Sequence, residues 1–310
     1  MGFDVICAGM ALVDSIIRGF DPTPVSASGY RAESGSLNVG GEAVNAAMAA
    51  AKLGLKTGIL CGLGNDAAGD MVRAALEKSG VDTGRIVPVE QTPVTTMFVR
   101  EDGTRRSVTN RAHRIALYPE KEPGLFTDAK ALVLGSLFRA PFDDPERIHR
   151  MLLQARAAGQ AVFADTKLPN FRMLGLEDLR DSLPLMDFIT PNEDEAKYFT
   201  GKEQPEAMAE EFLATGVKNV IIKLGAEGCY WKSAGESLRL PGYKVKAVDA
   251  TGAGDNFLAG FVSEILRGKT IPEALRFANA CGAICATAVG AAAALRNREQ
   301  VLAFMEERKD

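Results

Sequence analysis

The sequence Val248-Asp249-Ala250-Thr251-Gly252-Ala253-Gly254-Asp255-Asn256-Phe257 separates an extended segment from an apolar segment with helical periodicity. Its glycines allow a tight turn and a close approach of a ligand to the backbone. A helix that begins here directs unpaired N–H groups and its positive dipole end into one space, which is an anion site typical of phosphate. Asp255 next to that site fits a base that accepts a proton from an attacking hydroxyl group. Taken alone, Asp255 is equally well explained as a first-turn acid, and Asp249 as a turn residue.

Composition limits the class of protein. The chain has 310 residues, 46% apolar and 25% charged, with a formal net charge of −4, which is typical of a globular protein with a large core. We see no basic patch typical of nucleic-acid binding, and we expect neither a membrane span nor a signal peptide. The five cysteines form no Cys-x-x-Cys motif and are expected to be reduced core thiols of a cytoplasmic protein.

The chain contains two histidines, His113 and His149, each among charged residues. We expect both on the solvated surface. A histidine triad or a His-rich zinc site is therefore not expected, and carboxylates, lysines and backbone groups must carry any catalysis.

The central part of the chain alternates short β-rich segments with helical ones. We expect strands at 131–134, 161–165, 187–190 and 217–224, and helices at 146–158, 271–289 and 297–308. This order predicts a mostly parallel sheet with helices on both faces. Ligands of such sheets bind at the carboxyl ends of the strands. Five polar residues are expected at or just after strand ends: Ser136, Asp165, Asn192, Lys223 and Asp249.

The run from Asp249 to Phe257 resembles the signature of the ribokinase/PfkB carbohydrate kinase family. Further elements resemble that family and follow its order: Gly40-Gly41 with Asn45, Gly62-x-Gly64, Pro191-Asn192-x-x-Glu195 and Lys223-x-Gly225. The resemblance implies a single ribokinase-like domain over residues 1–310, a three-layer α/β/α sandwich with a small β-sheet lid. Two excursions, at about 14–38 and 90–112, would form the lid. The chain has no Gly-x-x-x-x-Gly-Lys-Ser/Thr motif, so it is not a P-loop kinase.

The resemblance also implies an ATP- and magnesium-dependent kinase that acts on a hydroxyl group of a small sugar-like substrate and forms a homodimer through the lid. Asp255 would be the base, and the backbone of Gly252, Ala253, Gly254 and Asp255 would form the anion hole. The implied substrate contacts are Asp14, Gly40, Gly41, Asn45 and Arg111. The implied nucleotide contacts are Asn192, Lys223, Gly225, Gly228, Asn279 and Gly282. Asn192 and Glu195 would help to place Mg²⁺, partly through water, and Asp249 and Thr251 would hold a monovalent cation such as K⁺.

Simpler or competing explanations exist for several of these motifs. Asn192 and Glu195 have the spacing of a helix capping box. Gly62-x-Gly64 begins a dinucleotide fingerprint with Asp82 at a suitable distance, as in a nicotinamide dehydrogenase. It does not lie in the first strand–turn–helix unit, however, and Asp82 follows Gly80 in a turn rather than a clear strand.

The acceptor remains open at this point. Ribokinases carry a basic residue where this chain has Glu42, and Gly135-Ser136-Leu137-Phe138 is more similar to fructokinase sequences. A nucleoside kinase of the same superfamily and a sugar-binding regulator without catalysis are the alternatives.

Overall fold

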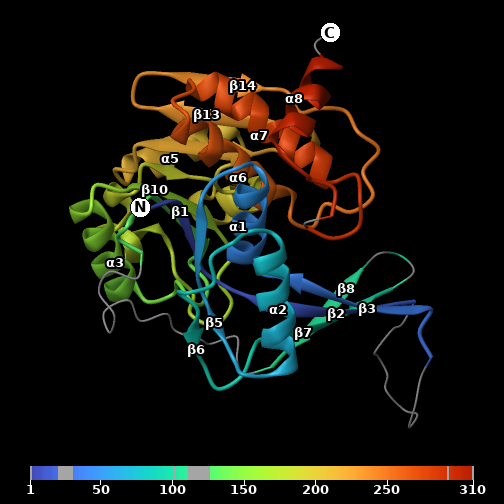
Figure 1. Cartoon of the computed structure of the whole chain (residues 1–310). Helices are drawn as coiled ribbons and strands as arrows, with labels where there is room; N and C mark the ends of the chain where they lie inside the picture. The colour runs from blue at the N-terminus through green and yellow to red at the C-terminus, as the bar shows by residue number, and fades with distance from the viewer. Residues whose placement is uncertain are drawn as a thin grey trace.

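The computed structural model describes residues 2–19, 31–100, 102, 104–110, 126–291 and 293–308. Its centre is an eight-stranded sheet with the strand order β14-β13-β12-β11-β10-β9-β1-β4 (Figure 1). The strands are β1 (Phe3–Ala8), β4 (Thr57–Leu60), β9 (Ala129–Leu137), β10 (Ala161–Thr166), β11 (Phe188–Ile189), β12 (Asn219–Lys223), β13 (Cys229–Ser233) and β14 (Ser237–Leu240). The pairs from β4 to β12 are parallel, and β12, β13 and β14 pair antiparallel. The predicted mostly parallel sheet is confirmed.

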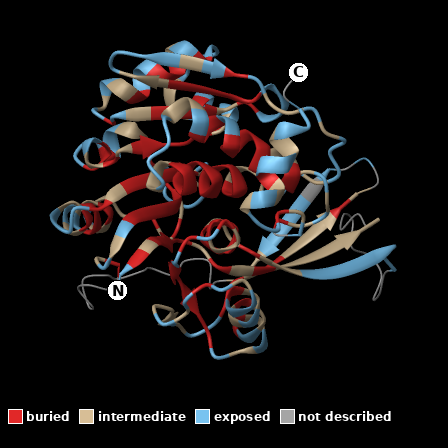
Figure 2. Ribbon diagram, turned by 45° about the horizontal axis from the view of Figure 1, so that its top comes forward, coloured by how far each residue is buried: buried red, intermediate tan, exposed pale blue. Residues whose placement is uncertain are grey.

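Both faces of this sheet are buried, as its strand sequences require. Side chains alternate between the two faces of a strand, and in β1 Val5 and Cys7 enter one apolar cluster while Ile6 and Ala8 enter the other. The first cluster includes residues of α1 (Glu42–Lys52), α2 (Ala67–Lys78), α6 (Ala253–Leu266), α7 (Ile271–Cys285) and α8 (Arg298–Glu306). The second includes residues of α3 (Pro145–Ala157), α4 (Glu193–Thr200) and α5 (Pro205–Ala214). Figure 2 shows these two buried layers, and the three-layer α/β/α prediction is confirmed.

A smaller four-stranded sheet extends away from the central one (Figure 1). Its order is β3-β2-β7-β8, formed by β2 (Leu12–Arg18), β3 (Ser34–Gly40), β7 (Val94–Val99) and β8 (Arg105–Thr109). The two predicted excursions therefore contribute two strands each, and β7 and β8 pair as an antiparallel hairpin. Asp14, Thr95 and Thr109 are aligned across three of the strands. That this sheet acts as a lid stays a prediction.

Shorter elements complete the described chain. β5 (Gly62–Leu63) pairs with β6 (Val87–Pro88) in a two-stranded sheet. Single turns of 3₁₀ helix are η3 (Leu176–Leu179), η4 (Leu183–Leu185) and η5 (Gly225–Glu227).

Three predictions about local structure were wrong. Helix α7 ends at Cys285 and not at residue 289, because the chain turns there and the Ala286 carbonyl accepts a hydrogen bond of 2.8 Å from the Val248 N–H. Asp249 does not follow a strand, since residues 241–247 are not in the sheet and Val248 donates its N–H to the turn at Ala286. His149 is half-buried on α3 because it adjoins the buried Ile148, whereas His113 lies outside the described residues.

Candidate active site

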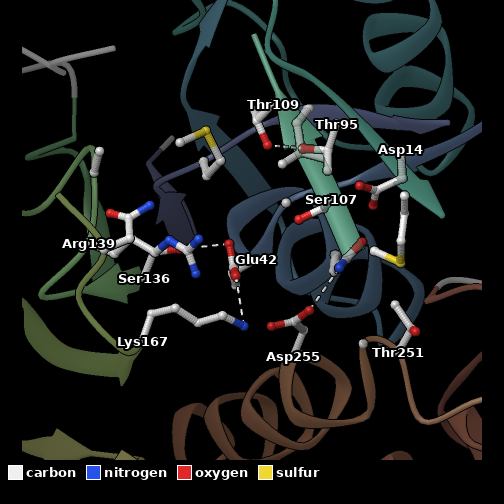
Figure 3. Close-up of a pocket in the computed structure, with 18 of the residues that line it drawn as sticks. Asp14, Glu42, Thr95, Ser107, Thr109, Ser136, Arg139, Lys167, Thr251 and Asp255 are labelled. Carbon is white, nitrogen blue, oxygen red and sulfur yellow. Dashed lines mark hydrogen bonds and ion pairs between the residues drawn. The ribbon is translucent and has the colours of Figure 1, made fainter. Parts of the chain in front are cut away.

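A cavity of about 500 Å³ lies between the small sheet, helix α1 and the start of helix α6 (Figure 3). Most of the groups that decide its chemistry are charged. Its lining includes the carboxylates of Asp14, Glu42 and Asp255, the cations Arg139 and Lys167, and the amide of Asn45. A hollow of this size, with several polar groups among apolar side chains, suits a small hydroxylated molecule.

The signature loop, residues 249–254, enters helix α6 through Gly252. Gly252 has φ 78°, and a Cβ at this position would lie 2.2 Å from the Cβ of Ala291, so only glycine fits. No side chain caps this end of the helix within the described part of the chain. The Ala253 N–H already donates to the Ala250 carbonyl at 3.1 Å, which leaves the N–H groups of Gly254 and Asp255 as the better candidates for an anion.

Asp255 is buried at the first turn of α6, and its carboxylate faces the cavity (Figure 3). The Asn45 side-chain amide donates a hydrogen bond of 2.8 Å to Asp255 Oδ2. Burial, with the negative charges of Glu42 and Asp165, raises the pKa of Asp255 to about 7 although Asn45 and Lys167 oppose the shift. A base with a pKa near neutrality is suited to proton transfer at that pH.

Glu42 and Lys167 form an ion pair at the centre of the cavity. Lys167 Nζ lies 3.1 Å from Glu42 Oε1, and the Ser136 hydroxyl donates a hydrogen bond of 2.6 Å to Glu42 Oε2. Burial alone would raise the pKa of Glu42, but Lys167 and Ser136 outweigh it and hold the pKa at about 2. Glu42 in turn raises the pKa of Lys167. Both groups are therefore charged at neutral pH.

Asp14 contributes the third carboxylate of the cavity, from strand β2. Burial and the charge of Glu42 raise its pKa to about 6. The structure favours glycine at both predicted positions, 40 and 41. A Cβ on Gly40 would lie 2.6 Å from Asp14 Oδ2. Gly41 has φ 101°, and a Cβ there would lie 2.3 Å from the Met10 carbonyl oxygen. Of the two, Gly41 lines the cavity. Arg111, the remaining predicted substrate contact, lies outside the described residues.

Lys223 reaches the signature loop from the end of β12. Its Nζ lies 2.6 Å from Asp165 Oδ1, and a Cβ on Gly254 would come within 3.2 Å of the same Nζ. This ammonium group therefore lies beside the first turn of α6, where an anion would also meet the helix N-terminus.

Asn192 and Glu195 form the predicted capping box at the start of α4. The Asn192 N–H donates to Glu195 Oε2 at 3.0 Å, and Thr166 Oγ1 donates to the same oxygen at 2.8 Å. Burial raises the pKa of Glu195, with Lys223 opposing this shift. These two hydrogen bonds to Oε2 fix the orientation of the buried Glu195 carboxylate.

Of the other predicted nucleotide contacts, Gly228 and Asn279 contact the end of β14 and the segment that follows it. A Cβ on Gly228 would lie 2.1 Å from the Leu240 carbonyl, and the Asn279 amide donates to the Pro241 carbonyl at 3.2 Å. Gly282 packs against the start of α6, where a Cβ would lie 3.2 Å from the Ala253 carbonyl. Gly225 is exposed with φ 58°. The packing by itself explains Gly228 and Gly282, whereas Gly225 has free space around it.

Asp249 and Thr251 are joined in one turn of the signature loop. Asp249 Oδ1 accepts from the Thr251 N–H at 3.0 Å and from the Thr251 hydroxyl at 2.7 Å, and Oδ2 accepts from the Gly290 N–H at 3.1 Å. These bonds connect the signature loop to the turn after α7. They also occupy the carboxylate that was predicted to bind a monovalent cation.

The turn at Gly62-x-Gly64 does not offer a dinucleotide site. Asp66 caps helix α2 by accepting from the Gly69 N–H at 2.8 Å and also accepts from the Thr92 N–H at 2.8 Å. A Cβ on Gly64 would lie 2.6 Å from Asp66 Oδ2, so the space next to the glycine is filled by the chain itself. The dehydrogenase interpretation loses its phosphate site.

Sequence reasoning did not identify Lys167 and Arg139 as site residues. Lys167 directly follows strand β10, so the rule that ligands gather at strand ends contained a usable signal. Arg139 lies two residues beyond β9 and carried no comparable signal.

A model of the pfkB family carbohydrate kinases matches residues 8–298. The chain belongs to this family. A ribokinase of Haemophilus influenzae is 30% identical over 86% of this chain and 87% of its own length. Fructokinase-1 of Oryza sativa subsp. japonica is 29% identical, with 97% of each chain covered.

Solved structures agree with this family membership. Arabidopsis thaliana ribokinase complexed with ribose and ATP has a TM-score of 0.86 and 25% identity, with 99% of each chain covered. A putative ribokinase II from E. coli in complex with ATP and Mg²⁺ has a TM-score of 0.78 and 27% identity, covering 98% of this chain and 99% of that one. Within the residues that the structure covers, no helix is long and apolar enough to span a lipid bilayer. All five cysteines are buried free thiols, as predicted.

Proposed function

We propose that this carbohydrate kinase transfers a phosphoryl group from ATP to a hydroxyl group of a small sugar-like acceptor, with Asp255 as the base. The observation that carries the proposal is a buried carboxylate with a pKa near 7 at an uncapped helix N-terminus, facing a polar cavity. The acceptor hydroxyl would lie next to Asp255 and lose its proton to it as the oxygen attacks.

Several residues would hold the acceptor in the cavity. Asn45 Oδ1 is buried and has no hydrogen-bond partner among the described residues. An unsatisfied buried acceptor atom is costly, so a substrate hydroxyl that donates to it would bind favourably. Asp14 faces the same cavity and would accept a second hydroxyl.

The transferring phosphoryl group would lie against the N-terminus of α6. The N–H groups of Gly254 and Asp255, the helix dipole and the Lys223 ammonium group all favour negative charge there. Gly252 holds the turn that exposes them. Two similar proteins of known structure are complexed with ATP, which supports ATP as the donor. The nucleotide would lie on this side of α6, where Gly282 packs against the start of the helix.

The residues present fit a magnesium ion that is held mainly by phosphate and water. Over the described ranges, no group of three or more His, Cys, Asp or Glu side chains is arranged to hold a metal. Mg²⁺ commonly takes only one or two protein carboxylates and keeps several waters. Glu195, whose described bonds all go to Oε2, would orient such a hydrated ion together with Asn192. When bound, the ion would neutralise charge on the phosphates.

The charged groups of the lining favour a sugar over a nucleoside, the main alternative within the superfamily. A nucleoside kinase needs a wide apolar surface for the base, whereas in this cavity three carboxylates and two cations lie among the apolar side chains. The third alternative, a regulator without catalysis, would have no need of a base with a pKa near neutrality.

An ADP-release assay with Mg²⁺ and ATP tests the proposal. The panel should hold pentoses, hexoses, sugar acids, sugar phosphates and nucleosides, and one or a few sugar-like acceptors should give rapid turnover. Turnover with nucleosides alone would favour the alternative. ATP binding without turnover on any acceptor would favour the regulator, and the absence of both would contradict the kinase proposal.

The proposal includes a monovalent cation beside Asp249 and Thr251. Its support is the position of the signature loop against the carbonyl-rich turn after α7, where Ala286 and Ala291 expose carbonyl groups to neighbouring donors. Because Asp249 already accepts three hydrogen bonds, we expect K⁺ to increase kcat only modestly. Replacing K⁺ by tetramethylammonium at constant ionic strength measures the effect.

The proposal also includes a homodimer through the small sheet. Leu37 and Val108 are 62% and 66% exposed, and the strand register places them on one face. Exposed apolar side chains on one sheet face favour contact with a partner. Light scattering should show a dimer for the wild-type protein and a monomer for the double variant Leu37→Asp/Val108→Asp. A monomeric wild-type protein would contradict the proposed homodimer.

A further inference from the structure

Arg139 is a cavity cation whose side chain has no partner among the described residues. The other cation, Lys167, is paired with Glu42 at 3.1 Å. Arg139 lines the same cavity, but its guanidinium group makes no hydrogen bond or ion pair with any part of the chain that the structure describes. A guanidinium group carries five donors in a planar fork that matches carboxylate and phosphate oxygens.

The turn that positions Arg139 contains two residues in an unfavourable backbone conformation. Ser136 and Phe138 have φ values of 68° and 75°, which non-glycine residues rarely adopt. The Ser136 hydroxyl donates a hydrogen bond of 2.6 Å to Glu42, and the fully buried Phe138 ring packs against Phe199 with centroids 4.2 Å apart and a 35° angle between the rings. The Arg139 N–H closes the turn onto the Ser136 carbonyl at 3.0 Å. Such strain persists where the surroundings enforce it, typically at ligand sites.

The charges of the cavity are separated in space. In Figure 3 Arg139 lies on one side of Glu42, and Asp14 and Asp255 lie on the other. An anionic group would be repelled by the two aspartates and attracted by the guanidinium group. Asn170, which also lines the cavity, adds a neutral amide.

From this arrangement we infer that the acceptor carries an anionic group, a carboxylate or a phosphate, which Arg139 binds while the reacting hydroxyl lies at Asp255. Charge separation then sets the direction in which the acceptor enters the cavity. The inference rests on the proposed kinase function and names its substrate class. It makes Arg139 a specificity residue, distinct from the residues that handle the proton.

Matched acceptor pairs test this inference. We would compare ribose with ribose 1-phosphate, fructose with fructose 6-phosphate, and glucose with gluconate in the ADP-release assay. For at least one pair, kcat/KM should be roughly 10- to 100-fold higher for the anionic member, since hydrogen bonds to charged groups contribute this much. Arg139→Met should remove that preference mainly through KM, and Arg139→Lys should restore part of it. The exposed Arg180, which does not line the cavity, supplies the control Arg180→Met.

Calorimetric titration of the whole protein with the same compounds, without ATP, keeps the two proposals separable. Turnover with neutral members and no preference for their anionic partners would overturn the anion inference and leave the kinase function intact. Equal losses for both members in Arg139→Met would overturn it as well. Absence of turnover, together with binding of an anionic member that Arg139→Met weakens at least about tenfold, would contradict the kinase function and support the anion site. Absence of both turnover and binding would overturn both.

Discussion

The side-chain amide of Asn45 donates a hydrogen bond of 2.8 Å to the carboxylate of Asp255, although 210 residues separate the two in the sequence. The bond connects helix α1, which begins beside the small sheet, to the first turn of α6, which begins at the signature loop. It stabilises the ionised form of a buried acid and so opposes the effect of burial on its pKa.

Replacement of Asn45 by Ala should therefore raise the pKa of Asp255 further. Because kcat/KM reports the ionisation of the free enzyme, its acidic limb should move from about pH 7 to higher pH in Asn45→Ala. A pH profile of kcat/KM with the best acceptor measures the shift. A limb that stays in place would mean that a group other than Asp255 controls it.

Glu42 and Lys167 provide two variants with opposite expected effects. The charge of Glu42 raises the pKa of Asp255 and that of Lys167 lowers it. Glu42→Gln should therefore shift the acidic limb of kcat/KM to lower pH, and Lys167→Met should shift it to higher pH. Both variants break the same ion pair, so an effect of losing that pair would be common to both, whereas the electrostatic effect on Asp255 would be opposite. Shifts in the same direction would contradict the electrostatic account.

Gly252 and Gly254 should have different roles, the first in the stability of the fold and the second in turnover. Gly252→Ala forces a side chain into φ 78° and against Ala291, so it should lower the free energy of unfolding by about 1–3 kcal/mol. Gly254 has no left-handed φ, and its new Cβ would meet only the flexible end of Lys223. Gly254→Ala should thus reduce kcat with little change in stability. Urea denaturation and kinetics together distinguish the two, and similar unfolding curves would disprove the claim for Gly252.

A buried ion pair fixes helix α8 to α6. Arg298 Nε and Nη2 each donate to a different oxygen of Glu264 at 2.8 Å, and Glu264 is buried. Arg298→Met leaves that charge, among the described residues, with the more distant Arg267 at 3.7 Å, so the free energy of unfolding should fall by about 3 kcal/mol. The additional change Glu264→Gln should recover part of the loss. Both values come from urea denaturation, and a loss below about 1 kcal/mol would show that the pair behaves as an exposed one.

The sequence allowed much of the architecture to be predicted because the signals are local. The alternation in β1 and the order of strands and helices follow from hydrophobic patterning. Ser136, Asp165, Asn192 and Lys223 lie at or just after strand ends, as expected. The error at the end of α7 arose because its alanine-rich continuation looks helical, while the bonds that end the helix come from residue 248, far away in sequence.

The electrostatics of the site could not be read in the same way. Glu42 was recognised only as a departure from ribokinases, and its pairing with Lys167 depends on how α1 meets the end of β10. Charged residues beyond strand ends, such as Arg139, look like solvated loop residues in a sequence. Their role depends on a cavity that forms only when the two sheets and α6 are in place.

The most direct test of the central claim is the turnover of Asp255→Asn at pH 8 with saturating Mg-ATP and the best acceptor. Asparagine keeps the size of the side chain and cannot accept the proton, so kcat should fall by roughly 10²- to 10⁴-fold while both ligands still bind in calorimetry. Because folding favours the protonated acid, whose folded pKa is about 7, ionised Asp255 destabilises the protein above that pH, and Asp255→Asn should unfold at no lower urea concentration. A variant that binds both ligands and retains near-normal kcat would contradict the assignment of Asp255 as the base.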